Sequence, residues 1–238
     1  MSEAEGLTVS PFRLVVFDCD GTLVDSQHSI VAAMNVAFEE AGLDEPDAAA
    51  VRHVVGLALE EAIARLLPRA ISEQHRQVAA AYRRAFHILR QRPDYQEPLF
   101  PGICDVIDGL GRAGSLLGVA TGKSRRGLIA TLERHGLRDR FVTLQTVDDN
   151  PGKPAPDMLL RAMRETGADP AETAMIGDTI YDLEMARRAG TAAIAATWGY
   201  HDAAELGPYA DAVAESPATL LSVIEILSGR SSCVSEQF

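Results

Sequence analysis

Two aspartates, one residue apart, follow a short apolar segment near the start of the chain. Asp18 and Asp20 belong to the sequence FDCDGTLVDS, directly behind the apolar residues 14–16. Two carboxylates this close at the end of a buried strand repel each other unless a cation, a proton or an incoming electrophile lies between them. Asp and Gly after a strand are also typical of a turn or a helix start, so this run alone leaves both explanations open.

Three further groups of polar residues also follow apolar runs. Thr121 and Gly122 offer a hydroxyl and a backbone amide just before a predicted helix, whose N-terminus favours an anion. Lys153 lies between prolines and glycine in GKPAPD, which suggests a fixed positive charge. Asp178 and Asp182 are four residues apart in GDTIYD and can share one side of a helix. Each group also has a structural explanation, as a helix cap or as a surface lysine.

The elements that would position these groups alternate between short apolar runs and helical patterns. This alternation predicts an α/β fold, a Rossmann-like parallel sheet core flanked by helices. The predicted strands cover residues 13–17, 115–120, 141–147, 173–177 and 192–197. All four polar groups then lie at the carboxyl ends of strands, the edge where open α/β sheets bind ligands.

Together the four groups supply what phosphoryl transfer requires. The carboxylate of Asp18 can attack phosphorus and form an aspartyl phosphate. Asp20 can protonate the leaving oxygen and later take a proton from water. Mg²⁺ prefers oxygen ligands, which Asp18, the carbonyl of Asp20 and Asp178 can provide, with Asp182 supporting these ligands from behind.

The order of the motifs resembles that of a known family. DxDGTLxDS, a strand ending in Thr-Gly, then GKPxPD and GDxxxD are similar to the haloacid dehalogenase superfamily of aspartate-nucleophile phosphohydrolases, from about Phe12 to Leu227. The resemblance implies that Thr121 and the Gly122 amide hold phosphate. It implies that Lys153 neutralises charge on the nucleophile and on the phosphoryl group. The later half of the chain looks like phosphoglycolate phosphatases.

The segment between the first two predicted strands reads as helical and is too long for a single crossover. The resemblance implies that it is a cap inserted after the first motif, which closes over the site and selects the substrate. The predicted domains are a core at 11–25 and 99–228, a cap at 26–98, and flexible tails at 1–10 and 229–238.

Within the cap, Gly56 looks like part of a substrate-specificity loop, and Arg52 is a candidate for binding a substrate carboxylate. The two helical faces expected to be buried are Ile30, Met34, Ala37, Phe38 and Ala41, and Val78, Tyr82, Ala85, Phe86 and Leu89. The arginines of the later cap helix could contact an anionic substrate, but a solvated outer face is the favoured prediction for them: Arg76, Arg83, Arg84, Arg90 and Arg92.

Composition narrows the class of protein. The chain has 238 residues, of which 47% are hydrophobic, as expected of a soluble globular protein. A net charge of −12 argues against a nucleic-acid partner. No apolar run approaches the roughly 20 residues that span a bilayer, and the start lacks a signal peptide, so no membrane partner and a cytoplasmic location are expected. Three widely spaced cysteines predict neither disulfides nor structural zinc.

The sequence therefore predicts a Mg²⁺-dependent phosphatase that hydrolyses a small phosphomonoester, either phosphoglycolate-like or a sugar phosphate, as a monomer or homodimer. Dehalogenases of this superfamily lack the counterpart of Asp20. Phosphonate hydrolases use a cap lysine, and there is no lysine between Ser26 and Pro98. A sugar phosphomutase uses the same residues and remains open as the alternative. A receiver-type phosphoacceptor domain, the alternative from another class, has a different motif order and no large cap.

Overall fold

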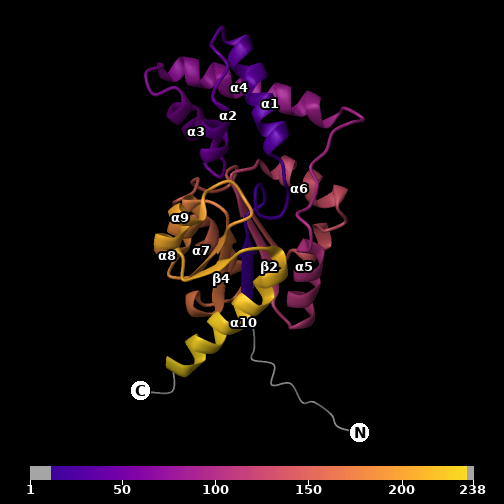
Figure 1. Ribbon diagram of the computed structural model, residues 1–238, viewed down its shortest axis with the longest axis vertical. Helices are drawn as coiled ribbons and strands as arrows, with labels where there is room; N and C mark the ends of the chain where they lie inside the picture. Colours follow the sequence, from indigo (N-terminus) through magenta and orange to yellow (C-terminus); the bar gives the residue numbers. More distant parts are fainter. Residues whose placement is uncertain (1–11, 235–238) are drawn as a thin grey trace.

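A computed structural model describes residues 12–234 of the chain. In this part, six strands form one parallel sheet in the order β3-β2-β1-β4-β5-β6 (Figure 1). The strands are β1 Leu14–Phe17, β2 Leu116–Thr121, β3 Thr143–Thr146, β4 Thr173–Gly177, β5 Ala192–Ala196 and β6 Ala212–Ala214. The predicted parallel α/β fold is confirmed, and its first strand lies at the centre of the sheet.

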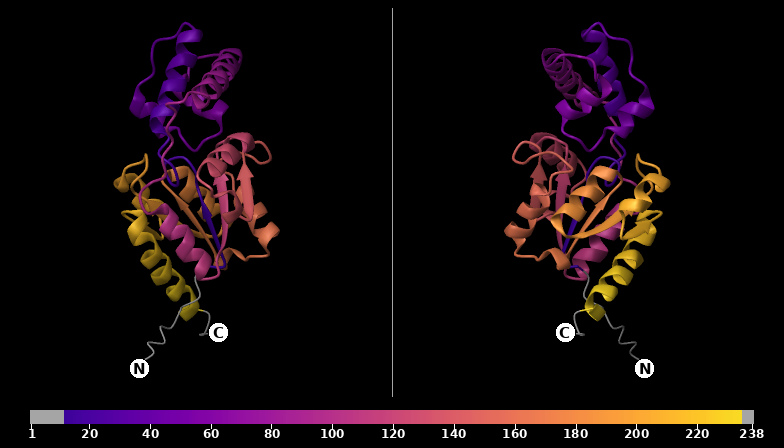
Figure 2. Two further views of the ribbon diagram at one scale, coloured as in Figure 1. Left: turned by 90° about the vertical axis from the view of Figure 1, so that its right-hand side faces the viewer. Right: turned by 90° about the vertical axis from the view of Figure 1, so that its left-hand side faces the viewer.

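The central strand is buried on both faces, which explains why its sequence is apolar throughout rather than alternating. Val15 and Phe17 pack on one side, and Leu14 and Val16 on the other. The first side is covered by α5 Ile103–Arg112, α6 Arg125–Arg134 and α10 Pro217–Val234, and the second by α7 Asp157–Thr166 and α8 Ile180–Ala189 (Figure 2).

Two details differ from the sequence-based prediction. The edge strand β6 was not predicted, because it is only three residues long and its Val213 is 43% exposed. Helix α10 continues to Val234, beyond the predicted start of the C-terminal tail at 229. Residues 1–10 and 235–238 of the predicted tails lie outside the described residues. The remaining short elements are α9 Ala203–Leu206, η1 Arg138–Arg140, η2 Pro170–Glu172 and η3 Gly207–Tyr209.

Four helices between β1 and α5 form a separate bundle over the carboxyl ends of the strands (Figures 1 and 2). They are α1 Gln27–Glu40, α2 Ala48–His53, α3 Leu59–Leu66 and α4 Ser72–Arg90. Their apolar faces share a core that includes Met34 and Phe38 of α1 and Val78 of α4. Helix α1 ends where Gly42 adopts a positive φ of 66°, a conformation that favours glycine.

The bundle is joined to the sheet domain by two adjacent segments of the chain, and His53 of the bundle also packs against the sheet domain. Val24 forms an antiparallel bridge with Leu99, so the outgoing and returning segments run side by side. The ring of His53 in the bundle stacks on His201 of the sheet domain, with 4.3 Å between ring centroids. The Tyr181 hydroxyl donates a hydrogen bond to the His53 carbonyl at 3.2 Å. These contacts hold the bundle against the sheet edge.

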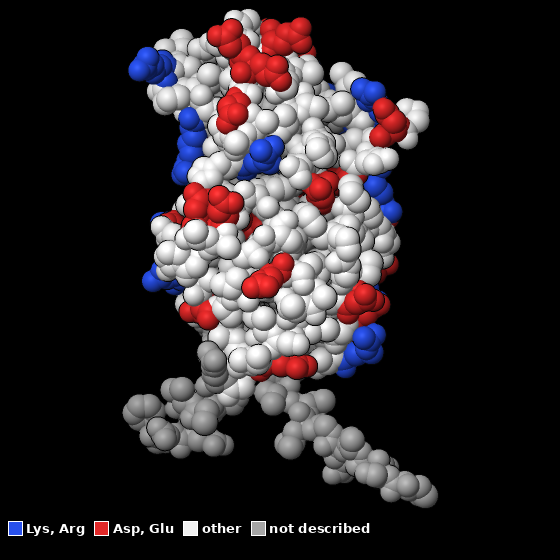
Figure 3. Space-filling view, viewed as in Figure 1, with Lys and Arg blue, Asp and Glu red and all other residues white. Residues whose placement is uncertain are grey.

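The surface carries both signs of charge. On the face shown in Figure 3, acidic side chains are interspersed with lysines and arginines, rather than separated from them. Among the described residues, no helix combines the length and the apolar character needed to cross a membrane.

Candidate active site

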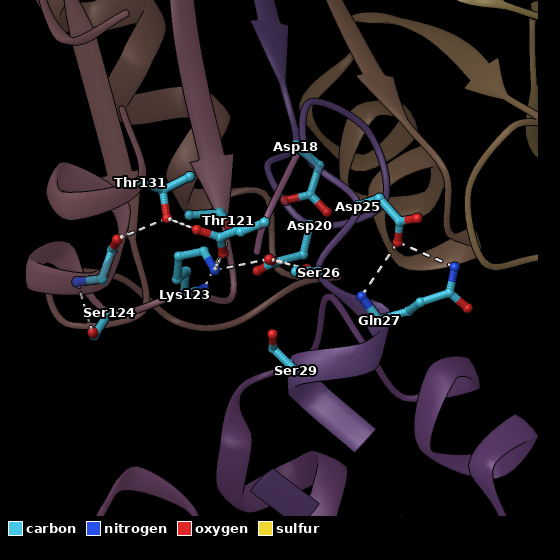
Figure 4. Close-up of polar contacts among 12 residues, drawn as sticks. Asp18, Asp20, Asp25, Ser26, Gln27, Ser29, Thr121, Lys123, Ser124 and Thr131 are labelled. Atoms are coloured by element: carbon cyan, nitrogen blue, oxygen red, sulfur yellow. Dashed lines mark hydrogen bonds and ion pairs between the residues drawn. The ribbon is translucent and has the colours of Figure 1, made fainter. Parts of the chain in front are cut away.

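Asp18 and Asp20 follow the central strand and line a cavity of about 740 Å³ between the sheet edge and the helical bundle. The Asp18 N–H donates to the Ile176 carbonyl at 2.9 Å, which extends the pairing of β1 with β4 by one residue. Gly21 then turns the chain with a φ of +86°. Figure 4 shows both aspartates at the end of β1, with Lys123 reaching Asp20 from the loop after β2. The structure therefore brings the two predicted catalytic residues to one wall of the cavity.

Lys153 is fully buried between two carboxylates. Its Nζ lies 2.7 Å from Asp18 Oδ1 and 2.5 Å from Asp182 Oδ1. Burial lowers the pKa of Lys153, but the charges of Asp18 and Asp182 outweigh burial and raise it, so the ammonium group stays protonated. The other Asp182 oxygen accepts hydrogen bonds from the Thr179 N–H and hydroxyl, at 3.1 and 2.6 Å. Asp182 therefore orients Lys153 toward Asp18.

Three buried carboxylates, those of Asp18, Asp178 and Asp182, place oxygens within 4.8 Å of one another. Burial raises the pKa of Asp18 to about 7 even though Lys153 opposes the shift. Burial, Asp18 and Asp182 also raise the pKa of Asp178. Asp18 Oδ2 is buried and has no hydrogen-bond partner among the described residues. Together these carboxylates can carry more negative charge than Lys153 neutralises. Buried carboxylate oxygens are also the ligands that Mg²⁺ prefers, so the cluster fits this ion.

Asp178 is held in place by neighbours that leave little room around it. Its Oδ1 accepts a hydrogen bond from the Thr22 hydroxyl at 2.7 Å, and its Oδ2 accepts one from the Tyr200 N–H at 2.9 Å. A Cβ atom at Gly21 or at Gly199 would overlap the Asp178 side chain. Both glycines are therefore needed so that the backbone can pass this close to the carboxylate.

Thr121 and Gly122 lie at the end of β2, and both line the cavity. The Thr121 hydroxyl accepts a hydrogen bond from the Lys123 N–H at 3.2 Å. Helix α6 begins three residues after Gly122, and the Ser124 hydroxyl caps it by accepting a hydrogen bond from the Gly127 N–H at 3.2 Å. A hydroxyl and a backbone amide just before a helix N-terminus suit an anionic oxygen.

A second buried charge network, which the sequence analysis did not single out, surrounds Asp20. Lys123 Nζ lies 2.8 Å from Asp20 and 3.1 Å from Glu97. Asp20 also accepts a hydrogen bond from the Ser26 hydroxyl at 2.5 Å, and Glu97 pairs with Arg90 at 3.5 Å. Asp20 and Glu97 outweigh burial and raise the pKa of Lys123, so it stays charged. Lys123 and Ser26 both contact Asp20 Oδ1, so this network holds the Asp20 side chain in place beside the cavity.

Arg90 is a correction to the predicted outer face of the later cap helix. Its side chain is 16% exposed and lines the cavity, because α4 ends beside α6 and the guanidinium donates to the Gly127 carbonyl and the Thr131 hydroxyl. The other four arginines of that group are exposed and pair with acidic residues: Arg76, Arg83, Arg84 and Arg92.

The two candidates in the cap are placed differently. Gly56 has a φ of +94° and lines the cavity, where an added Cβ would lie 3.2 Å from the Thr179 hydroxyl. Its neighbour Leu57 places its carbonyl 2.7 Å from the position of a Cβ at Gly122. Arg52 is not among the described residues that line the cavity.

Comparison with known proteins identifies the family of this chain. The family model for haloacid dehalogenase-like hydrolases matches residues 15–196. Probable phosphatase IndB of Dickeya dadantii is 41% identical over 197 residues, covering 81% of this chain and 84% of that protein. Phosphoglycolate phosphatase of Chromobacterium violaceum is 36% identical over 229 residues, covering 92% and 99%.

The fold is also shared with a solved structure. A haloacid dehalogenase-like family hydrolase from Streptococcus pneumoniae superposes with a TM-score of 0.78 at 28% identity, covering 91% of this chain and 99% of that one. The sequence-based expectations of the family and of a phosphatase are both confirmed by these relatives. The chain belongs to the haloacid dehalogenase-like hydrolases.

Proposed function

We propose that this protein is a Mg²⁺-dependent phosphatase that hydrolyses a small phosphomonoester through a phosphoaspartate at Asp18. The observation that carries the proposal is the surroundings of Asp18. Its carboxylate lies on the cavity wall, 2.7 Å from the buried Lys153, with one oxygen free of any hydrogen bond among the described residues. A carboxylate held this way is oriented by a cation and keeps an oxygen available for attack.

In the proposed reaction, Asp18 forms a bond to phosphorus while the bond from phosphorus to the leaving oxygen breaks. Asp20 donates a proton to that oxygen. Thr121, the Gly122 amide and Lys153 bind the phosphoryl oxygens. Water then attacks the phosphoaspartate, Asp20 takes its proton, and Asp18 is released with inorganic phosphate.

Mg²⁺ would be held by Asp18, the Asp20 carbonyl and Asp178. Asp182 would support these ligands without binding the ion itself. When bound, the ion supplies positive charge that stabilises the phosphoryl oxygens in the transition state. The clustering of these carboxylates in a buried site supports this assignment.

The helical bundle has the position expected of a cap. We propose that residues 26–98 act as a cap over a core formed by 11–25 and 99–228, and that Gly56 belongs to the loop that contacts substrate. Gly56 lines the cavity, and the adjacent Leu57 carbonyl approaches Gly122 closely. A closed cap of this kind excludes water from the reacting groups. The proposal includes a cytoplasmic location, where thiols such as those of Cys19 and Cys104 are kept reduced.

The substitution Asp18→Asn tests the mechanism, because it keeps the shape of the side chain and removes the nucleophile. We expect phosphate release to fall to background while circular dichroism and the melting temperature report a folded protein. Asp25→Asn is the control: Asp25 lies close by and accepts hydrogen bonds from Gln27 instead of lining the cavity (Figure 4). Near-normal phosphate release by Asp18→Asn would contradict the mechanism.

Acid quenching during a single turnover distinguishes the covalent route from direct attack by water on the substrate. The covalent route leaves a phosphorylated peptide that contains Asp18, whereas direct attack leaves the protein unmodified. Absence of that peptide at every quench time would refute the covalent intermediate. Recovery of an isomerised sugar phosphate instead of free phosphate would identify a mutase.

A further inference from the structure

The cavity above Asp18 and Asp20 is larger and more apolar than a short acid requires. Its volume of about 740 Å³ lies within the range of roughly 300–1,000 Å³ found for pockets that enclose drug-sized ligands. All four cap helices contribute apolar side chains to its wall, among them Met34 of α1, Val51 of α2, Ala62 of α3 and Phe86 of α4. The part of the cavity that faces away from the nucleophile is therefore built to contact hydrocarbon surface.

The cationic groups on the cavity wall are engaged by protein partners. In the cap, Arg83 pairs with Glu60, and Arg84 pairs with Glu40 at 2.7 Å. Arg90 is held by Glu97, as described above. On the core side, the exposed Arg126 donates to His87 Nδ1 at 2.6 Å, and Lys123 bridges Asp20 and Glu97. Among the described residues that line the cavity, each arginine of the cap is therefore paired with an acidic residue. None of these arginines is free to bind a substrate carboxylate.

An aromatic pair stands next to the catalytic end of the cavity. The rings of Tyr82 and Phe86 lie 5.6 Å apart on α4, and Lys123 Nζ is 5.6 Å from the centre of the Phe86 ring. The same lysine contacts Asp20 at 2.8 Å, so the pair lies close to where a leaving group receives its proton. Tyr82 lines the cavity together with Phe86. Burial raises its pKa, so it remains a neutral donor.

From this arrangement we infer that the phosphatase acts on phosphomonoesters with a bulky, uncharged and largely apolar leaving group, and that Phe86 and Tyr82 contact that group. The inference rests on the proposed phosphatase function and specifies its substrate class. A short carboxylated leaving group, such as the glycolate of phosphoglycolate, would place a second anion among the apolar side chains of the cap, which is costly. Among the described lining residues, the cation without an acidic partner is Arg126, which belongs to the core, is exposed and donates from its guanidinium to His87. An aromatic or aliphatic leaving group would instead bury its surface against the cap and stack on the aromatic pair.

The test compares primary alkyl phosphates, so that the reactivity of a phenolic leaving group does not decide the result. The esters are 2-phenylethyl phosphate, glucose 6-phosphate and phosphoglycolate, each measured with Mg²⁺ at the same pH. We expect kcat/KM to be at least about tenfold higher for 2-phenylethyl phosphate than for phosphoglycolate, the factor that corresponds to one favourable aromatic contact. Equal or higher kcat/KM for phosphoglycolate overturns the inference while leaving the phosphatase proposal standing.

Binding of phosphonates decides the inference even if no ester in the panel is hydrolysed. In 3-phenylpropylphosphonate and 3-phosphonopropionate, a methylene replaces the bridging oxygen of 2-phenylethyl phosphate and phosphoglycolate. Calorimetry with the Mg²⁺-loaded protein should show tighter binding of the phenyl compound, and tighter binding of the carboxylate compound refutes the inference. Failure of all esters to release phosphate would count against the proposed function and not against this binding preference.

Substitutions on one helix assign the preference to the aromatic pair. Phe86→Ala is expected to reduce the preference for 2-phenylethyl phosphate over phosphoglycolate about tenfold, and Phe86→Leu to retain most of it because an apolar side chain remains. Ile88→Ala is the matched control, since Ile88 lies two residues further along α4, is 62% exposed and does not line the cavity. A preference that is unchanged in folded Phe86→Ala would show that Phe86 does not contact the leaving group.

Discussion

Replacing Lys123 with methionine tests how much the buried network around Asp20 contributes to stability. Methionine keeps most of the apolar stem and removes the ammonium group that lies 2.8 Å from Asp20 and 3.1 Å from Glu97. Breaking a buried ion pair by removing one partner costs about 3–5 kcal/mol. Asp20 would keep its hydrogen bond from Ser26, and Glu97 would keep Arg90 at 3.5 Å, so the lower end applies. We expect the free energy of unfolding to fall by about 3 kcal/mol.

Urea denaturation at neutral pH measures this loss directly, and a fall in melting temperature of about 6–12 °C should accompany it. Arg76→Met is the control, because Arg76 pairs with Glu73 at 2.6 Å on the open surface, where both side chains are more than half exposed. Such a pair contributes less than about 1 kcal/mol. A loss for Lys123→Met no larger than that for Arg76→Met would refute the stabilising role of the network.

A double-mutant cycle separates the contact between Lys123 and Glu97 from the other effects of each substitution. We expect Lys123→Met combined with Glu97→Gln to cost less than the sum of the single losses, by about 1–2 kcal/mol, because the second substitution removes a carboxylate that the first leaves poorly compensated. Strict additivity would show that the two side chains do not interact in solution.

Three other predictions concern pH, the cap and the metal. Burial raises the pKa of Glu97, but Lys123 and Arg90 outweigh it and hold the pKa below its ordinary value of 4.5, so its contribution to stability is present above that pH and lost as the pH falls below it. Urea midpoints from about pH 6 to about pH 3.5 should therefore fall less steeply in Glu97→Gln than in the wild type, and equal slopes would contradict this. Gly122→Ala should lower kcat/KM by about tenfold to a hundredfold, because the new Cβ would lie 2.7 Å from the Leu57 carbonyl and displace the cap loop. Gly199→Ala should weaken Mg²⁺ binding about tenfold or more by displacing Asp178, as measured by calorimetry. Gly207→Ala, with nothing within 4 Å of its added Cβ, should change neither property, and a similar loss there would show that both effects are nonspecific.

The sequence was informative wherever a feature depends on neighbouring residues. The apolar run ending at Phe17 and the motifs that follow strands identified the fold and the residues around Asp18, because parallel strands bring their carboxyl ends to one edge. The network around Asp20 has no such local signature. Ser26 and Glu97 belong to the two connections between core and cap, whereas Lys123 belongs to the loop after β2. Only the tertiary fold brings these residues together.

The character of the substrate cavity was equally hidden in the sequence. The apolar faces of α1 and α4 predicted a buried core for the cap, but helical periodicity does not distinguish residues that pack on one another from residues that line a cavity. Met34 does both, since it belongs to the cap core and also lines the cavity. Arg90 was assigned to the outer face from its charge alone, whereas the approach of α4 to α6 turns it inward.

The side-by-side connections of the cap have a consequence for how proteins of this kind diversify. The chain leaves and re-enters the core where Val24 bridges Leu99 and where the Asp25 N–H donates to the Pro98 carbonyl at 2.8 Å. Because the entry and exit points adjoin, the length and sequence of everything between them can change without altering the spacing of Asp18, Lys153 and Asp178. Insertions, exchanges of helices and new pockets in the cap are therefore compatible with a single unchanged reaction core.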